Sequence, residues 1–237
     1  MTDTTYRRAL LKVSGEALGG ASGRGLDFDV IRALCRSVHA CVEKGVQLGL
    51  VAGGGNYWRG VKDGGGKMER SRADQMGMLA TVMNSLALAE ALEQEGVEAR
   101  VMTNVDMPRV SESYCRGRAV HHLEKGRVVL FAGGTGNPYF STDSAAALKA
   151  AEIGADILLM AKNIDGVYTA DPKTDPAAVR LDTMTYDRIL EEHLGVIDST
   201  AACLLRDNAI PTMIFALEPP ENILRVLRGE RIGTIVQ

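Results

Sequence analysis

Short apolar runs and amphipathic stretches alternate along the chain. The apolar runs predict buried strands at residues 7–13, 46–51, 97–103, 127–131, 156–160, 211–217 and 231–237. Apolar residues at helical spacing predict helices over residues 27–44, 71–95, 111–126, 142–153, 186–195, 196–209 and 221–230. Residues 14–27 are so rich in glycine that we expect only a loop there. Because strand and helix alternate, the pattern predicts an α/β fold whose parallel sheet is covered by helices on both faces.

The stretch from 127 to 148 joins an apolar strand to an alanine-rich helix through a loop of glycine and small hydroxyl residues. Gly133, Gly134 and Gly136 allow positive φ and close backbone approach, and Thr142 or Asp143 can cap the helix. Free N–H groups and the helix dipole at such a turn favour an anion. Taken alone, the stretch fits an ordinary strand–loop–helix connection equally well.

A second glycine turn favours the anion site. Gly53–Gly55 come one residue after the strand at 46–51, Lys12 lies at the end of the first strand, and Arg59 follows the turn. Two such turns after buried strands, with two cations, predict a polyphosphate site. The stretch Gly64–Gly66 lacks the P-loop spacing, and neither turn supplies the third glycine of GxGxxG. A Walker-type kinase and a Rossmann dinucleotide site are therefore disfavoured.

The long helix at 71–95 carries more apolar residues than one buried face needs. One side holds Met76, Leu79, Val82, Met83, Leu86 and Leu92, with further apolar residues around it. We expect burial by the helix's own domain or by another subunit, and the pattern favours a subunit interface. Asp74, in the first turn, either complements the helix dipole or binds a sugar hydroxyl. The polar loop at 161–176 predicts either a surface hairpin or a nucleotide-contacting loop.

Composition narrows the function classes. The net charge is −3 and the pI is near 5.9, and no basic block is present, which disfavours an electrostatic nucleic-acid binder. No apolar run is long enough to span a membrane and the N-terminal residues show no secretory signal, so we expect a cytoplasmic protein. The four cysteines and four histidines lack zinc-site or redox spacing. No linker, repeat or change in composition divides residues 1–237, which predicts one domain.

Five segments together resemble one known family. They are KVSGEAL at 12–18, GGGNYWRG at 53–60, DQMGMLATVMN at 74–84, GTGNPYFSTD at 134–143 and DGVYTADP at 165–172. On these motifs the chain is similar, over essentially its whole length, to the bacterial uridylate (UMP) kinases of the amino-acid kinase superfamily. The resemblance implies a three-layer α/β/α sandwich with a central, mainly parallel sheet. It also implies transfer of phosphate from ATP to UMP in pyrimidine nucleotide biosynthesis; the segments at 74–84 and 134–143 point to UMP as the acceptor.

The same resemblance implies the binding residues. It places the ATP phosphates against Lys12, Val13, Ser14, Gly15, Gly55 and Arg59, and the ATP nucleoside against Lys162 or Asn163, Tyr168 and Asp171. It places UMP against Gly54, Asp74, Thr135, Gly136, Asn137, Pro138, Tyr139, Phe140, Ser141 and Thr142. Some relatives carry a second catalytic lysine where this chain shows the Asp198 region. We therefore expect Arg59 or another group to take that role.

Phosphoryl transfer between two phosphates needs charge neutralisation more than proton transfer. The acceptor phosphate has a second pKa near about 6, so it is largely ionised at neutral pH and needs no general base. We expect Lys12 and Arg59 to stabilise the transferring group, and Asp143 to orient Lys12 and a Mg²⁺-bound water. Mg²⁺ is expected to arrive with ATP, and the sequence offers no dense carboxylate cage for a metal.

The resemblance also implies regulation and assembly. The segment Gly20, Ala21, Ser22, Gly23, Arg24 and Gly25 resembles one linked to activation by GTP, UTP is the expected inhibitor, and the family assembles as homohexamers. Neither a nucleic acid nor a membrane is an expected partner. Two alternatives remain open: a superfamily kinase acting on a carboxylate or carbamate, and a non-catalytic nucleotide-binding regulator or storage subunit. The intact set of Lys12, Arg59 and Asp143 argues against the second alternative.

Overall fold

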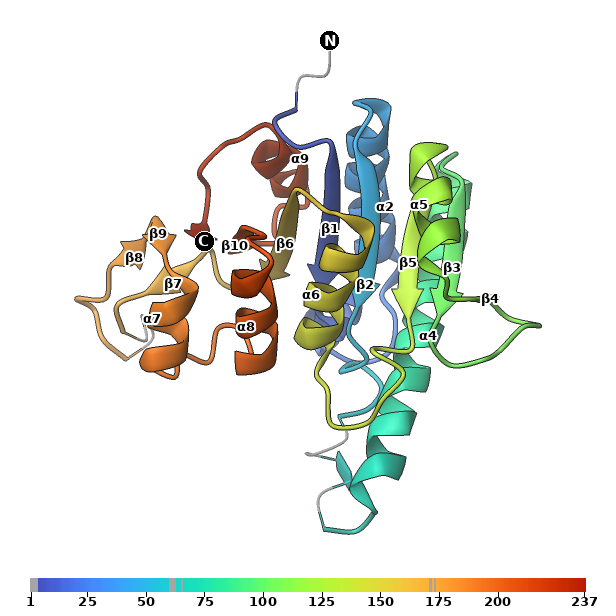
Figure 1. The fold of residues 1–237 in the computed structure, drawn as a ribbon, viewed down its shortest axis with the longest axis horizontal. Coiled ribbons are helices and arrows are strands. Elements are labelled where there is room, and N and C mark those ends of the chain that lie inside the picture. Colours follow the sequence, from blue (N-terminus) through green and yellow to red (C-terminus); the bar gives the residue numbers. More distant parts are fainter. Residues whose placement is uncertain (1–3, 60–62, 65, 171, 173) are drawn as a thin grey trace.

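Parallel strand pairing organises the protein (Figure 1). The computed structural model describes residues 4–59, 63–64, 66–170, 172 and 174–237. Within these ranges one sheet runs in the order β4-β3-β5-β2-β1-β6-β10-β11-β9, and β7 and β8 form a separate antiparallel pair. Among the pairings described for the large sheet, only that of β10 with β11 is antiparallel. The expected mainly parallel sheet is confirmed.

The elements follow the predicted alternation of strand and helix. The strands are β1 (Arg8–Val13), β2 (Gln47–Ala52), β3 (Ala99–Thr103), β4 (Glu112–Ser113), β5 (Val128–Ala132), β6 (Ile157–Lys162), β7 (Val167–Tyr168), β8 (Arg180–Leu181), β9 (Thr183–Met184), β10 (Thr212–Ala216) and β11 (Thr234–Val236). The helices are α1 (Gly15–Leu18), the 3₁₀ turn η1 (Gly20–Ser22), α2 (Phe28–Glu43), α4 (Arg70–Gln94), α5 (Arg116–Glu124), α6 (Thr142–Ile153), α7 (Tyr186–Glu191), α8 (Ser199–Asp207) and α9 (Asn222–Leu227).

Helices cover both faces of the sheet and give the expected three layers (Figure 1). Helices α2, α4 and α9 pack on one face, and α5, α6, α7 and α8 on the other. Strand β1 shows the division: Ala9, Leu11 and Val13 belong to the first core, whereas Leu10 belongs to the second. Because both faces are buried, the central strands are continuous apolar runs and not alternating ones.

Local sequence explains where the helices begin. Asp27 caps α2 by accepting hydrogen bonds from the backbone N–H groups of Asp29 and Val30. Ser141 caps α6 in the same way, through the N–H of Ser144. The expectation that Thr142 or Asp143 caps this helix is therefore wrong, because both already lie in its first turn. The carboxylate of Asp143 is consequently free for other contacts.

Two further expectations are wrong. Residues 14–27 are not all loop, because Ser14 accepts a hydrogen bond from the N–H of Ala17 and the fully buried Leu18 anchors the short helix α1. Residues 111–126 are not all helix, because Glu112 pairs with Met102 and forms β4 before α5 begins. In both places a tertiary contact outweighs the local composition.

Helix α4 presents two different faces. Val82 and Leu92 are buried in the protein, whereas Met76, Leu79, Met83 and Leu86 are 38–48% exposed. The expected burial within the chain therefore applies to only part of the apolar surface. Helix α4 has 25 residues but is not apolar enough to cross a membrane. No other helix in the described part of the chain is long and apolar enough either.

Four neighbouring strands deliver candidate site residues to one edge of the sheet. Strands β5, β2, β1 and β6 are adjacent and parallel, so their C-terminal ends meet. Lys12 lies near the end of β1 and Lys162 ends β6, whereas Gly53 and Gly133 directly follow β2 and β5. Polar groups from four separate segments thus converge in the crevice where α/β proteins bind ligands.

Candidate active site

A cluster of three charged side chains lies at this edge. The ammonium of Lys12 is 2.8 Å from one carboxylate oxygen of Asp143, and the ammonium of Lys162 is 3.8 Å from the other. The three side chains are only 12%, 23% and 16% exposed for Lys12, Lys162 and Asp143, respectively. Two cations therefore share a single anion in a mostly buried place.

Burial and charge act against each other in this cluster. Burial alone raises the pKa of the Asp143 carboxyl, but the adjacent Lys12 and Lys162 outweigh it and hold that pKa below its ordinary value. Burial lowers the pKa of Lys162, and Lys12 lowers it further, whereas Asp143 partly opposes the shift. The arrangement therefore keeps Asp143 ionised and leaves an excess of positive charge, which an anion can neutralise.

Asp198 ties the neighbouring helices to the cluster. It caps α8 through the N–H of Ala201 and accepts hydrogen bonds from the hydroxyls of Ser141 and Ser144 at the start of α6. Lys162 also donates to the backbone carbonyl of Val196, just before α8. The orientation of the charged cluster is thus fixed by two helix N-termini.

The two segments expected to hold the ATP phosphates touch each other. A Cβ atom on Gly15 would lie 2.5 Å from the carbonyl oxygen of Gly53 and 2.7 Å from the nitrogen of Gly55. Such distances exclude any side chain at position 15 without movement of the backbone. The sequence therefore needs glycine here so that the start of α1 can lie against the Gly53–Gly55 turn.

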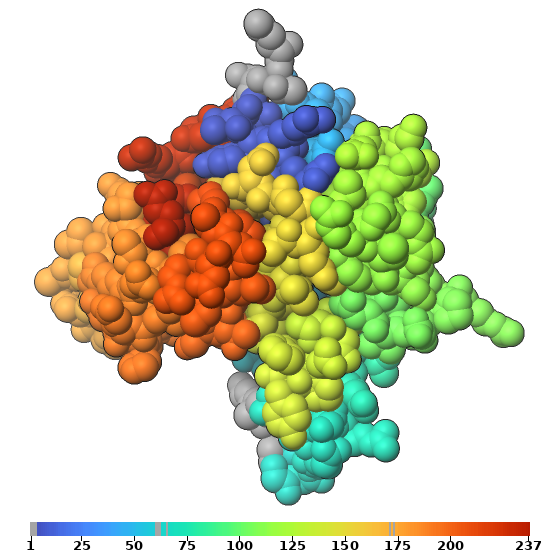
Figure 2. All heavy atoms as spheres, in the orientation of Figure 1, coloured from blue at the N-terminus to red at the C-terminus, as the bar shows by residue number. Residues whose placement is uncertain are grey.

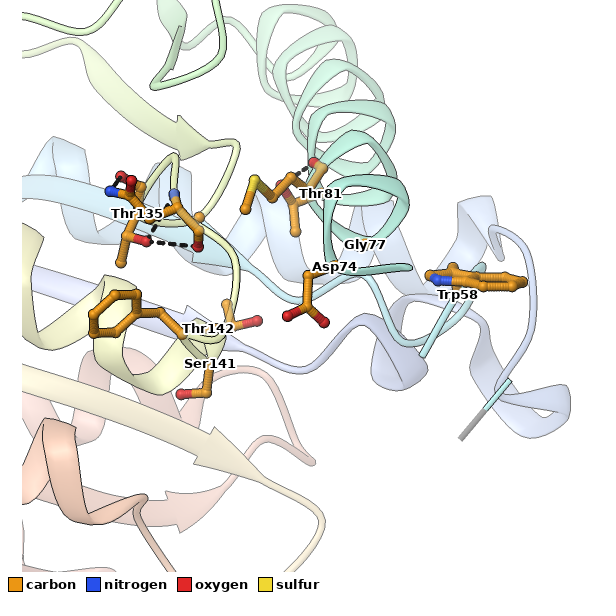
Figure 3. A pocket seen from close by; sticks show the side chains of 11 residues that line it. Trp58, Asp74, Gly77, Thr81, Thr135, Ser141 and Thr142 are labelled. Carbon is orange, nitrogen blue, oxygen red and sulfur yellow. Dashed lines mark hydrogen bonds between the residues drawn. The ribbon is translucent and has the colours of Figure 1, made fainter. Parts of the chain in front are cut away.

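A pocket of about 160 Å³ opens beside these turns (Figure 3). Its walls come from the segment after β2, from α4 and from the β5–α6 loop: Trp58, Asp74, Gly77, Met78, Thr81, Gly134, Thr135, Asn137, Phe140, Ser141 and Thr142. Six of these were expected to bind UMP. Of the other expected UMP residues, Gly54 packs against α4, and the lining does not include Gly136, Pro138 or Tyr139.

Asp74 connects α4 to the β5–α6 loop. Its carboxylate accepts hydrogen bonds from the backbone N–H of Tyr139, at 2.8 Å, and from the Nε of Arg70, at 2.7 Å. In Figure 3 it faces Ser141 and Thr142 across the pocket. Figure 2 shows the loop around residues 135–140 lying against the N-terminal part of α4. The pocket is therefore closed on one side by this contact.

Several expected ATP residues lie outside the charged cluster. Arg59 pairs with Glu16, a residue that sequence reasoning missed, and both side chains are 42% exposed. Tyr168 donates a hydrogen bond to Asp165, and Asn163 is exposed. Asp171 lies outside the described residues. In this structure the second cation that pairs with Asp143 is Lys162, whereas Arg59 pairs with Glu16. The expected role of Arg59 in phosphoryl transfer stays a prediction.

Residues of the 20–25 segment line two clefts that also contain expected ATP residues. Ser22, Gly23 and Arg24 lie beside Gly55 and Arg59 in a cleft of about 360 Å³. Gly20 and Ala21 lie beside Lys162 and Asn163 in another, of about 400 Å³. A segment expected to bind an effector is therefore adjacent to the expected donor site.

Comparison with known proteins agrees with this geometry. A family model described as the amino acid kinase family matches residues 7–216. The chain belongs to the amino acid kinase family.

Solved structures of this family resemble the chain over nearly its full length. The UMP kinase of Bacillus anthracis has a TM-score of 0.94 and 35% identity, covering 98% of this chain and 96% of that one. The UMP kinase of Ureaplasma parvum has a TM-score of 0.92 and 37% identity, covering 98% of both chains. The uridylate kinase of Archaeoglobus fulgidus has a TM-score of 0.72 and 28% identity, covering 97% of this chain and 99% of that one. The amino-acid kinase fold expected from the sequence is confirmed.

Sequence reasoning missed part of the pocket of this amino acid kinase family member. Trp58, Met78 and Thr81 line it. They were not assigned to UMP, although they lie inside the segments GGGNYWRG and DQMGMLATVMN on which the resemblance was based. Thr81 could have been found by its helical spacing from Asp74, because residues seven apart lie on one face of a helix. Trp58 gave no such signal.

We expect the Asp143→Asn substitution to destabilise the free protein. It leaves Lys12 and Lys162 mostly buried without their anion, which should lower the free energy of unfolding by about 3 kcal/mol. Urea unfolding without nucleotide measures the change. Adding Lys12→Met removes one uncompensated charge, so the double variant should be more stable than Asp143→Asn alone. A double variant of lower stability would contradict this electrostatic account.

Proposed function

We propose that this protein is a UMP kinase, which transfers the γ-phosphoryl group of ATP to UMP and gives ADP and UDP. The observation that carries the proposal is the match to two UMP kinases at 35% and 37% identity over 96–98% of their lengths. The charged cluster beside a pocket lined by expected UMP residues supports it. Among the residues that the structure describes, no specific contact favours a carboxylate acceptor or a non-catalytic role.

In the proposed mechanism, Lys12 and Lys162 hold the transferring phosphoryl group between them. Asp143 keeps both ammonium groups at the edge of the sheet and does not abstract a proton, because the UMP phosphate is already ionised at neutral pH. Preorganised cations stabilise developing charge without reorganisation during the reaction. Arg59, which pairs with Glu16, is positioned beside Gly55 to change partner when a phosphate binds.

We assign the two nucleotides to the two sides of the Gly53–Gly55 turn. ATP would bind along Lys12–Gly15, Gly55 and the end of β6, and UMP in the pocket between Asp74 and the 135–142 loop. Asp74 is already shared by Arg70 and Tyr139, so a ribose hydroxyl would donate to its remaining lone pairs. The hydrogen bond to Tyr139 would then order the loop around UMP.

Mg²⁺ fits this site as a companion of ATP. Within the described residues, no three His, Cys, Asp or Glu side chains cluster in a way that could hold a metal ion. Asp143 is engaged by two lysines, and Asp198 by two hydroxyls and an N–H group. Such isolated carboxylates suit an ion held mainly by phosphates and water, where it would neutralise charge on the β- and γ-phosphates.

The first test is acceptor selectivity. With ATP and Mg²⁺, we expect ADP release with UMP and little with CMP, AMP, GMP, aspartate or acetylglutamate. Lys12→Ala should lower turnover by about 10²–10³-fold because it removes a preorganised donor. Lys125→Ala, at an exposed position, serves as the control. Turnover with a carboxylate acceptor, or nucleotide binding without turnover, would refute the proposal.

GTP and UTP added to the same assay test the expected activation and inhibition, which stay predictions.

The alkaline limb of the pH profile tests Lys162. Its lowered pKa means that its proton, and with it one cation, is lost at a lower pH than for an ordinary lysine. As the pH rises, we therefore expect kcat/KM to begin to fall at a lower pH than the loss of a proton from an ordinary lysine would cause. Lys162→Arg should move this limb upward, because guanidinium stays charged. Lys125→Arg should not move it. An alkaline limb that stays in place with Lys162→Arg would assign the titration to another group.

We also propose that the exposed apolar face of α4 packs against a second copy of the chain in a homohexamer. The face is formed by Met76, Leu79, Met83 and Leu86, which recur at helical spacing. We expect Met83→Glu to reduce the molar mass in light scattering coupled to size exclusion, with helical content unchanged. Phe28→Glu, at an exposed apolar residue of α2, should leave the mass unchanged. A wild-type monomer would refute the assembly.

The cytoplasmic location and the pathway stay predictions.

A further inference from the structure

Two asparagines form a fully buried pair beneath the Gly53–Gly55 turn. Asn56 is 4% exposed and Asn84, on α4, is not exposed at all. Each side-chain amide donates to the other's oxygen, at 2.9 Å and 2.8 Å. A reciprocal amide pair of this kind uses one N–H and one oxygen of each residue.

The remaining N–H group of each amide holds a different backbone segment. Asn84 donates to the carbonyl of Gly53 at 2.6 Å, and Asn56 donates to the carbonyl of Gly25 at 2.6 Å. The backbone N–H of Gly25 donates in return to the carbonyl of Asn56. All four amide N–H groups are therefore satisfied, and the pair joins α4, the glycine turn and the 20–25 segment.

The same face of α4 holds the other glycine turn. The hydroxyl of Thr81, three residues before Asn84, accepts a hydrogen bond from the N–H of Gly133 at 2.9 Å and donates to the carbonyl of Met78. Thr81 is 5% exposed. One helix thus fixes both turns through short polar side chains, although its opposite face is exposed and apolar.

We infer that Asn56 and Asn84 are positioning residues for phosphoryl transfer: they fix the Gly53–Gly55 turn, and so the placement of the two phosphates relative to each other. The inference rests on the proposed function. The carbonyl of Gly53 and the N–H of Gly54 belong to one peptide plane, so holding this carbonyl also fixes the direction of that N–H. Neither asparagine touches the charged cluster in the contacts described, so the pair acts through the backbone that it holds.

The isosteric substitution Asn84→Asp removes both donors and keeps the shape. A carboxylate oxygen then faces the carbonyl of Gly53 and repels it, which displaces the turn. Since a displacement of about 1 Å in a reacting group can cost about 10²-fold, we expect kcat to fall about 10–100-fold. The loss should shrink as the pH falls, because a protonated carboxyl can again donate to Gly53.

Asn222→Asp is the matched control. Asn222 is a buried amide that also donates to two backbone carbonyls, those of Ala216 and Glu218, but it lies on α9 away from both glycine turns. We expect it to lower the melting temperature while kcat changes by less than about twofold.

Thr81→Val tests the other turn, and should raise KM for UMP without the fall in kcat caused by Asn84→Asp. Thr81→Ser, which keeps the hydroxyl, should have a KM for UMP close to that of the wild type.

Amide hydrogen exchange measures how firmly the two asparagines hold these backbone segments, and it does not depend on turnover. Asn84→Asp should speed exchange in the peptide covering residues 50–58, and Asn56→Asp should speed it in the peptide covering residues 20–27 as well. Equal kcat values for Asn84→Asp and Asn222→Asp at similar melting temperatures, or unchanged exchange at 50–58, would overturn the inference. If the wild-type protein does not turn over ATP with UMP, only the proposed function fails, and hydrogen exchange decides the positioning role.

Discussion

An imbalance of charge lies at the centre of this protein. Lys12 and Lys162 come from adjacent strands and share the single carboxylate of Asp143 in a mostly buried site. Desolvation makes each of these charges costly alone, so the cluster depends on the parallel sheet that brings the strand ends together. It also depends on the start of α6, which supplies Asp143 only because Ser141, and not Asp143, caps that helix. The excess positive charge makes the site ready for an anion.

The glycine turns surround this cluster, and α4 holds them in place. Gly15 lies so close to Gly53 that no side chain fits between them, and the Asn56–Asn84 pair fixes the same turn from below. Thr81 does the same for the turn at Gly133. Because the opposite side of α4 is an exposed apolar face, a contact made there acts on the helix that positions both turns. The proposed assembly contact and the candidate site therefore share one helix.

Much of this could be predicted from sequence alone, because apolar periodicity and glycine turns are local signals. The strand that carries Lys12, the helix after Ser141 and the mainly parallel sheet were predictable in this way. The strand at 156–160 was predicted too, but Lys162 was placed in the loop after it, whereas β6 extends to Lys162. The pairing of Glu112 with Met102 and the burial of Leu18 were not, since both depend on contacts between distant segments. In the site, the sequence could not tell whether Lys162 or Arg59 lies beside Asp143, because both residues are cations. Only the geometry shows that one faces Asp143 and the other pairs with Glu16.

The position of Trp58 has a practical consequence. It is the single tryptophan of the chain, it lines the pocket beside Asp74, and its indole N–H is anchored to the carbonyl of Ala73 at 2.8 Å. An indole held rigidly at the wall of a polar pocket changes its emission when water there is replaced by a ligand. The protein therefore carries its own fluorescent reporter, and occupancy of this pocket can be followed in solution without a label.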